Sequence, residues 1–261
     1  MSKKPELVLI PGAWHTPSHF NPLITKLRAL GYTTHSAQLA SVGNPDPPAD
    51  LTEDIAIVRA LVLNAIGDSG NDVVVLAHSW GGIIAGCALV GLGKKEREAQ
   101  GLSGGVVRTG YMAAYILDEG ICLQDAIHHF IPEWVDVQEP YVYAKVAKIF
   151  YGDLPEDEGQ YWFDQIKSQA VASFYAPATG AAWKEIPTSY LLCEDDECVP
   201  PQVQEGMVNG VKEAAGEIEV TRLKSGHSPF LSRVEETVVW VQRVAGDAVE
   251  LGKKDEGDEW A

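Results

Sequence analysis

Ser79 and its neighbours form the segment of this sequence best suited to covalent chemistry. An apolar run that ends at Ala77 leads into Ser79, and Gly81 follows two positions later. Small residues at these two flanking positions permit a tight turn from a strand into a helix, because larger side chains would collide with the neighbouring backbone. Such a turn, a nucleophile elbow, exposes the serine hydroxyl and directs the positive end of the next helix towards it. The A-x-S-x-G pattern therefore predicts a nucleophilic serine.

A serine nucleophile needs a histidine that accepts its proton and a carboxylate that orients the histidine. His227 lies in a loop, residues 224–230, that follows the strand-like run 218–223. The other histidines are less suitable, because they either precede Ser79 or fall in a segment that is typical of a lid. We therefore predict that His227 is the base.

The carboxylate is expected at the end of another apolar run, residues 188–193, which four consecutive acidic residues follow. Only one of these can accept the hydrogen bond of the imidazole, so the others are expected to be solvated or to cap a helix. Spacing alone does not distinguish Asp195 from Asp196. Asp118 is a third candidate, because it lies just past the strand-like run 106–112.

The elements that must position these residues alternate between strands and helices. The run 72–77 is apolar almost throughout, which is typical of a parallel strand covered by helices on both faces. The 261 residues, 46% of them hydrophobic, suffice for one sizeable α/β domain and are too few for two typical domains. Asp50 and Glu53 resemble a capping box at a helix start. The predicted strands are 7–10, 32–37, 72–77, 106–112, 188–193 and 218–223, and the predicted helices include 17–30 and 50–64.

The alternation breaks between about residues 115 and 182, where aromatic residues occur among short helical stretches. An insertion at this point is expected to form a cap over the site. A cap lined by aromatic rings would enclose a mostly apolar compound and exclude water. The aromatic residues are Phe130, Trp134, Tyr141, Tyr143, Phe150, Tyr151, Tyr161, Trp162, Phe163, Phe174 and Tyr175.

Four segments, residues 7–15, 77–82, 193–200 and 225–230, resemble those of the α/β-hydrolase superfamily. The resemblance is to its compact branch, which includes salicylate-binding methyl esterases, hydroxynitrile lyases and small fungal hydrolases, and it covers nearly the whole chain. The order serine, acid, histidine is also that of the superfamily. The resemblance implies a single domain, residues 1–261, with about six parallel strands, helices on both faces and a helical cap at about 115–182. The antiparallel pair that begins the full superfamily sheet is expected to be missing.

The same resemblance assigns roles within the site. In this branch the acid stands three residues before an aliphatic residue followed by proline, which places it at Asp196. The oxyanion hole would consist of the backbone N–H groups of Ala13 and Trp80. Pro11 stands where the family usually has a histidine, so the role of that histidine has no counterpart here.

The implied activity is that of a serine hydrolase that cleaves an ester or lactone of a small, mostly apolar molecule through an acyl-enzyme. Gly12, Trp14 and His15 are the expected substrate contacts, and no metal or organic cofactor is expected. The alternatives are a carbon–carbon bond hydrolase or lyase with the same triad, and a ligand-binding or biosynthetic protein on the same fold. One hydroxynitrile lyase type has threonine at the Gly12 position and lysine directly after the histidine, and another has asparagine at the Gly12 position. This chain has Gly12 and Ser228 instead.

The net charge of −17 and the pI near 4.7 argue against nucleic acid and anionic membranes as partners, because both require clustered Lys and Arg. The expected partner is a small-molecule substrate, and the oligomeric state, a homodimer included, is left open. The segment before the first predicted strand has no apolar stretch of a signal peptide, so a cytoplasmic location is expected. The charged residues 253–261 are expected to form a frayed, solubilising tail.

Overall fold

The computed structural model describes residues 3–214 and 216–247, so the predicted charged tail lies outside the described residues. Its main sheet has six strands in the order β2-β1-β3-β4-β8-β9, and every neighbouring pair is parallel. The predicted fold class and strand number are confirmed, and within the described residues this sheet has no initial antiparallel pair. The strands are β1 (Glu6–Ile10), β2 (Thr34–Ser36), β3 (Asp72–His78), β4 (Gly105–Met112), β8 (Thr188–Cys193) and β9 (Ile218–Leu223).

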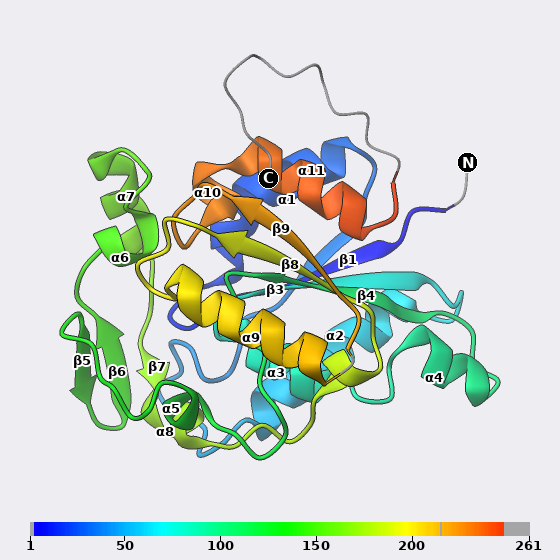
Figure 1. Cartoon of the computed structure of the whole chain (residues 1–261), viewed down its shortest axis with the longest axis horizontal. Helices are drawn as coiled ribbons and strands as arrows, with labels where there is room; N and C mark the ends of the chain where they lie inside the picture. Colours follow the sequence, from blue (N-terminus) through cyan, green and yellow to red (C-terminus); the bar gives the residue numbers. More distant parts are fainter. Residues whose placement is uncertain (1–2, 215, 248–261) are drawn as a thin grey trace.

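Helices cover both faces of the main sheet (Figure 1). One layer contains α1 (Asn21–Ala29), α10 (Pro229–Ser232) and α11 (Val234–Val244), and the opposite layer contains α2 (Thr52–Ile66), α3 (Gly81–Ala88) and α9 (Pro201–Glu213). The remaining elements outside the cap are the helix α4 (Lys94–Ala99) and the 3-10 helices η1 (Pro17–Phe20) and η2 (Ala182–Lys184).

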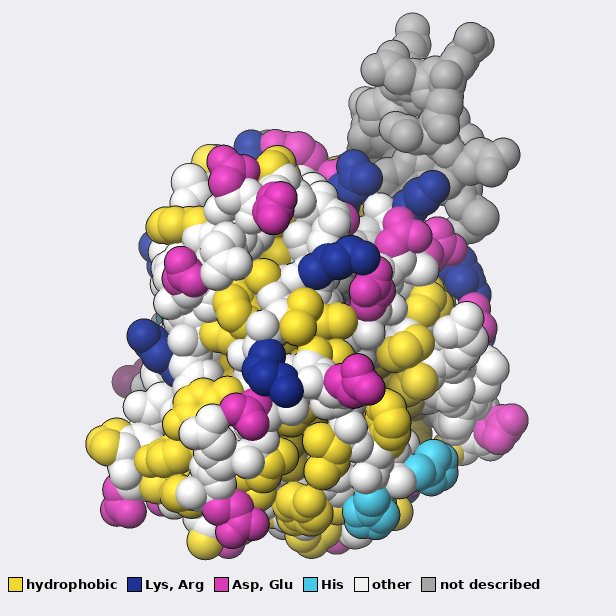
Figure 2. Space-filling model, turned by 90° about the vertical axis from the view of Figure 1, so that its left-hand side faces the viewer, with side chains coloured by type: hydrophobic (Ala, Val, Ile, Leu, Met, Phe, Trp, Pro, Cys, Tyr) yellow, Lys and Arg dark blue, Asp and Glu magenta, His cyan; other side chains and the backbone are white. Residues whose placement is uncertain are grey.

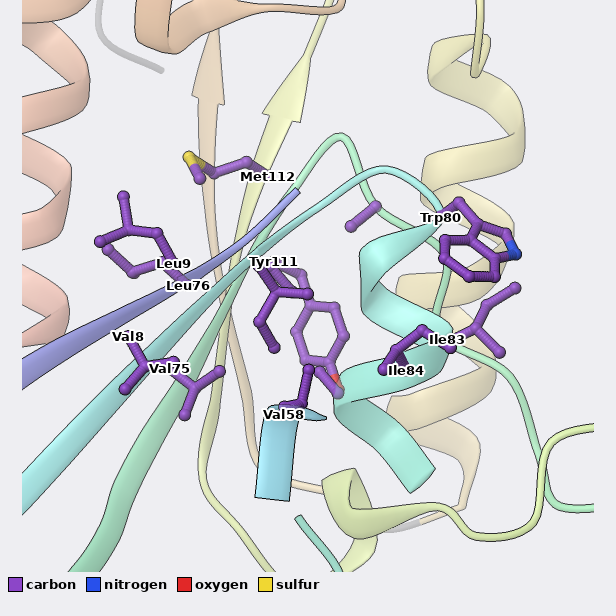
Figure 3. Close-up of a cluster of buried hydrophobic side chains, with 14 of the residues drawn as sticks. Val8, Leu9, Val58, Val75, Leu76, Trp80, Ile83, Ile84, Tyr111 and Met112 are labelled. Carbon is purple, nitrogen blue, oxygen red and sulfur yellow. The ribbon is translucent and has the colours of Figure 1, made fainter. Parts of the chain in front are cut away.

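Apolar side chains of the central strands fill the space between the sheet and both helical layers. Val8 pairs with Val75, and the next residues along the strands, Leu9 and Leu76, also pair. Because successive side chains of a strand point to opposite faces, the two pairs belong to different halves of the core (Figure 3). All four side chains are fully buried. The central strands therefore form a rigid platform whose carboxyl ends carry the loops of the site.

Residues 123–175, within the segment between β4 and β8, form the cap, and it is not the purely helical insertion that we expected. Three of its elements form an antiparallel sheet in the order β5-β6-β7. Residues 135–138 alternate in polarity with period two, and residues 141–144 include the strand-favouring Tyr141, Val142 and Tyr143, a strand signal that the aromatic composition obscured. The cap lies beside the carboxyl ends of the main strands (Figure 1). Its elements are α5 (Leu123–Ala126), β5 (Val135–Gln138), β6 (Tyr141–Ala144), α6 (Lys148–Tyr151), α7 (Glu156–Phe163), β7 (Gln169–Ala170) and α8 (Val171–Tyr175).

Local boundaries differ from the prediction at three places. The helix expected over 17–30 is divided into η1 and α1, and the strand expected over 32–37 is the shorter β2. The expected capping box is wrong: Leu51 is the N-cap of α2, and Asp50 Oδ1 accepts from the Thr52 N–H at 2.8 Å. In the part of the chain that the structure describes, no helix has the length and apolarity needed to cross a membrane.

Candidate active site

The turn between β3 and α3 has the geometry of a nucleophile elbow. Ser79 has φ +52°, in the left-handed region that non-glycine residues rarely adopt. A Cβ atom on Gly81 would lie 2.4 Å from the carbonyl oxygen of Pro11, and one on Gly82 would lie 2.2 Å from that of Tyr115. Only glycine fits at these two positions, because the loops that follow β1 and β4 lie close to the start of α3.

Ser79, His227 and Asp196 are joined by hydrogen bonds although they come from three different strand ends. The Ser79 hydroxyl donates to His227 Nε2 at 2.9 Å, and His227 Nδ1–H donates to Asp196 Oδ2 at 2.8 Å. All three residues are buried. The carboxylate fixes the imidazole tautomer that leaves Nε2 free to accept the serine proton.

The structure distinguishes the three candidate acids. Asp195 is exposed. Its backbone N–H donates to the carbonyl of Ser225 at 3.0 Å. Asp118 is also exposed and forms an ion pair with Lys184 at 2.8 Å. Asp196 is therefore the carboxylate that reaches the imidazole, as the resemblance implied.

Asp196 is held by donors that the sequence analysis did not identify. Its Oδ1 accepts from the N–H groups of Cys198 at 2.8 Å and Val199 at 2.9 Å, and its Oδ2 accepts from Gln204 Nε2 at 3.3 Å. Gln204 is fully buried, one helical turn before the buried Val208. A polar residue on the apolar face of α9, the helix that begins at Pro201, was the signal that could have revealed it.

The environment of His227 favours its protonated form. Burial is the largest single influence and opposes protonation, but the charge and hydrogen bond of Asp196, together with those of Cys198, raise the pKa of His227 well above 6.5. The imidazolium that forms when Ser79 loses its proton is therefore stabilised.

His78 supports the loop that carries His227, which the sequence analysis missed. Its Nε2–H donates to the backbone carbonyl of His227 at 2.9 Å, and the two ring centroids lie 4.6 Å apart. Burial and the neighbouring charge of His227 lower the pKa of His78 well below 6.5, so the ring stays neutral. His78 positions the base and does not compete with it for protons.

Ala13 and Trp80, the predicted oxyanion donors, line the same pocket as Ser79. Within the described residues, neither backbone N–H has a hydrogen-bond partner. Trp80 directly precedes α3, so the positive end of the helix dipole lies at this point. Two unpaired donors beside a serine hydroxyl are suited to stabilise an oxyanion.

Trp14 lines the pocket as predicted, and the cap holds it in place. Its backbone has φ +62°, a strained conformation for a tryptophan. The Trp14 N–H donates to Gln169 Oε1 at 3.3 Å, its carbonyl accepts from the Lys167 N–H at 2.8 Å, and its indole N–H donates to the carbonyl of Val142 at 2.9 Å. Three cap residues therefore fix the loop that follows β1.

Gly12 and His15, the other two expected substrate contacts, are not part of the pocket wall. His15 is buried, with hydrogen bonds to the Ala13 carbonyl at 2.7 Å and to the Tyr151 hydroxyl at 2.9 Å. A Cβ on Gly12 would lie 2.9 Å from Ser79 Cβ, so the glycine permits close packing behind the serine. The loop turns both residues away from the pocket.

The pocket above Ser79 has a volume of about 430 Å³ and a mainly apolar wall. Hydrophobic side chains also gather on the face of the molecule that carries the cap (Figure 2). The pocket-lining residue Phe130 is 66% exposed. No group of three or more His, Cys, Asp or Glu residues within 3–214 and 216–247 is arranged to hold a metal. Of the eleven cap aromatic residues, four line the pocket: Phe130, Trp134, Phe174 and Tyr175.

Comparisons with known proteins identify the family and the fold. The sequence model of the Alpha/beta hydrolase family matches residues 7–239. "Alpha/beta hydrolase nvfD" of Aspergillus novofumigatus is 32% identical over 254 residues, which cover 95% of this chain and 99% of that protein. The structure of a pyrethroid hydrolase from Sphingobium faniae superposes with a TM-score of 0.72 at 19% identity, covering 93% of this chain and 97% of that chain. Polyneuridine aldehyde esterase gives a TM-score of 0.71 at 15% identity, with 93% and 100% covered. The chain belongs to the alpha/beta hydrolase family.

Proposed function

We propose that this protein is a serine esterase or lactonase that acts on a small, mostly apolar molecule. The observation that carries the proposal is the chain of hydrogen bonds from Ser79 through His227 to Asp196 at the base of an apolar pocket. The names of the pyrethroid hydrolase and of polyneuridine aldehyde esterase, which share the fold, support hydrolysis and an ester bond as its target.

In the proposed reaction, His227 Nε2 takes the proton of Ser79 as Oγ attacks the carbonyl carbon of the substrate. The oxyanion accepts hydrogen bonds from the N–H groups of Ala13 and Trp80. His227 then gives its proton to the leaving alcohol, and an acyl-enzyme remains. Water attacks this ester with His227 as base, which releases the acid and restores the serine hydroxyl.

The pocket supports an apolar substrate with ring or branched-chain character. Trp14, Trp134 and Phe174 form a cluster of ring contacts in the wall, with the ring centroids of Trp134 and Phe174 at 5.9 and 5.7 Å from Trp14. The cap covers the serine and reduces the access of water to the acyl-enzyme. With a net charge of −17, the protein disfavours anionic substrates, and we propose a neutral small molecule as its partner.

The test compares wild-type protein with Ser79→Ala on a panel of aryl and alkyl esters and lactones at neutral pH. Turnover should fall by about 10⁴-fold or more in the variant, because the nucleophile is lost. Ser103→Ala, an exposed serine before β4, is the matched control and should keep full activity. Undiminished turnover in Ser79→Ala would contradict the assignment.

A further inference from the structure

We propose that one cap segment, residues 148–153, aligns the catalytic groups, with Tyr151 and Asp153 as positioning residues. This inference rests on the proposed function. The segment consists of α6 and the two residues after it, and we call it the bridging segment. It contacts the loops after β1, β8 and β9, which carry the oxyanion donor Ala13, the acid and the base.

Tyr151 reaches the oxyanion loop through His15. The fully buried Tyr151 hydroxyl donates to His15 Nε2 at 2.9 Å, and His15 Nδ1–H donates to the Ala13 carbonyl at 2.7 Å. This arrangement needs a neutral imidazole with one donor and one acceptor. Burial, and then the neighbouring His19, lower the pKa of His15 well below 6.5 and keep it in that form. The tyrosine therefore sets the orientation of the ring.

His15 in turn orients the oxyanion donor. Its backbone N–H donates to the carbonyl of Gly12 at 3.3 Å. The Gly12 carbonyl and the Ala13 N–H belong to one peptide group, and in a trans peptide they point in opposite directions. A bond that holds the carbonyl towards His15 therefore directs the Ala13 N–H away from His15.

Asp153 holds the loop of the base. Its Oδ2 accepts from the Gly226 N–H at 2.7 Å, and Gly226 directly precedes His227. Although Asp153 is exposed, the glycine lies close to its carboxylate, because a Cβ on Gly226 would lie 2.7 Å from Asp153 Oδ1. The hydrogen bond has a charged acceptor and belongs to the stronger class. It fixes the backbone from which the His227 side chain extends.

The Phe150 ring packs against both His15 and His227. Its ring centroid is 5.4 Å from that of His15 and 5.9 Å from that of His227, and its side chain is fully buried. The third contact, from Lys148 to Glu197 at 3.4 Å, joins two exposed side chains, and such pairs contribute little. The alignment therefore depends on Tyr151 and Asp153.

The experiment measures kcat and KM of Tyr151→Phe, Asp153→Ala and Asp153→Asn on the best ester of the panel. We expect kcat to fall about tenfold in Tyr151→Phe and Asp153→Ala with KM within about twofold, since each variant displaces a catalytic group without removing it. Asp153→Asn should recover most of kcat, because the amide oxygen can accept from the same N–H. Tyr161→Phe and Asp157→Ala, exposed cap residues, are matched controls and should behave as wild type.

A second readout separates this inference from the proposed function. A fluorophosphonate labels an activated serine without any ester substrate, so the rate of Ser79 labelling reports alignment even if no panel ester is cleaved. Slower labelling of Tyr151→Phe and Asp153→Ala at unchanged thermal stability, with recovery in Asp153→Asn, supports the bridging segment. Wild-type labelling rates in both variants, or a change in KM alone, would show that the segment does not align the catalytic groups.

Discussion

The main sheet and the cap contribute to one pocket but differ in how they are built. The sheet brings Ser79, His227 and Asp196 together on loops after buried parallel strands, where each residue is buried and hydrogen-bonded. The cap consists of short elements, and its pocket-lining side chains Phe130 and Tyr175 are more than half exposed. From this difference we propose that the sheet carries the chemistry and that the cap makes most of the substrate contacts. Variants on the two sides should therefore differ in whether kcat or KM changes.

The largest effect is expected on the sheet side, for Asp196→Asn. The amide cannot hold the imidazole in the required tautomer, so kcat should fall about 10⁴-fold. Because His227 must be neutral to accept a proton, kcat/KM of the wild type should decline as the pH falls through the raised pKa of His227. Removing the carboxylate charge lowers that pKa, so the acid limb should move to lower pH. A pH–rate profile of both proteins measures this shift. An acid limb at the same pH in the variant would contradict the pairing of Asp196 with His227.

A smaller effect is expected for Gln204→Met, which has nearly the same volume but removes the donor to Asp196 and also the hydrogen bonds of Gln204 to the backbones of Cys193 and Val199. The loss of the backbone bonds should lower thermal stability, and the loss of the bond to Asp196 should lower kcat. One hydrogen bond of this kind contributes about 1–1.5 kcal/mol, which corresponds to a loss of about tenfold in kcat. KM should not change, because Gln204 does not line the pocket. Steady-state kinetics on the same ester, with a thermal melt of each protein, provide the check. A rise in KM with kcat intact would show that the residue acts on the pocket instead.

The smallest effect is expected on the cap side, for Phe174→Ala. This ring lines the pocket and packs against Trp14 and Trp80, so its loss removes apolar contact with the substrate. We expect KM for bulky esters to rise about fivefold and kcat to stay within about twofold, as for a loss of about 1 kcal/mol of binding. Phe163→Ala, a cap phenylalanine outside the pocket wall, is the control. A large drop in kcat would contradict the proposal that the sheet carries the chemistry and the cap binds the substrate.

The same division explains what could be predicted from the sequence. The main strands were predicted to within a few residues, because buried parallel strands leave continuous apolar runs and the elbow at Ser79 requires small neighbours. Asp196 was selected over Asp195 only by resemblance, since both follow the same strand and only the fold determines which side chain turns inward.

The strands of the cap were not predicted, because its segments are short and half-buried. The strands β5 and β6 have only four residues each, and the polar–apolar alternation is present in β5 alone. The contacts of Tyr151 and Asp153 join residues 136 and 73 positions apart, and no local pattern reports such a pairing. His15 was expected in the pocket because of its place beside the oxyanion loop, but sequence position does not determine the direction of a side chain in a strained loop.

The left-handed backbone at Ser79 has a consequence for the evolution of this protein. A non-glycine residue in that region destabilises the native state by about 1–3 kcal/mol, whereas glycine adopts it freely. A glycine at position 79 would relax the turn and delete the nucleophile at the same time. Selection for thermal resistance alone would therefore favour an inactive chain at this site, and keeping a serine there requires continued selection for reactivity.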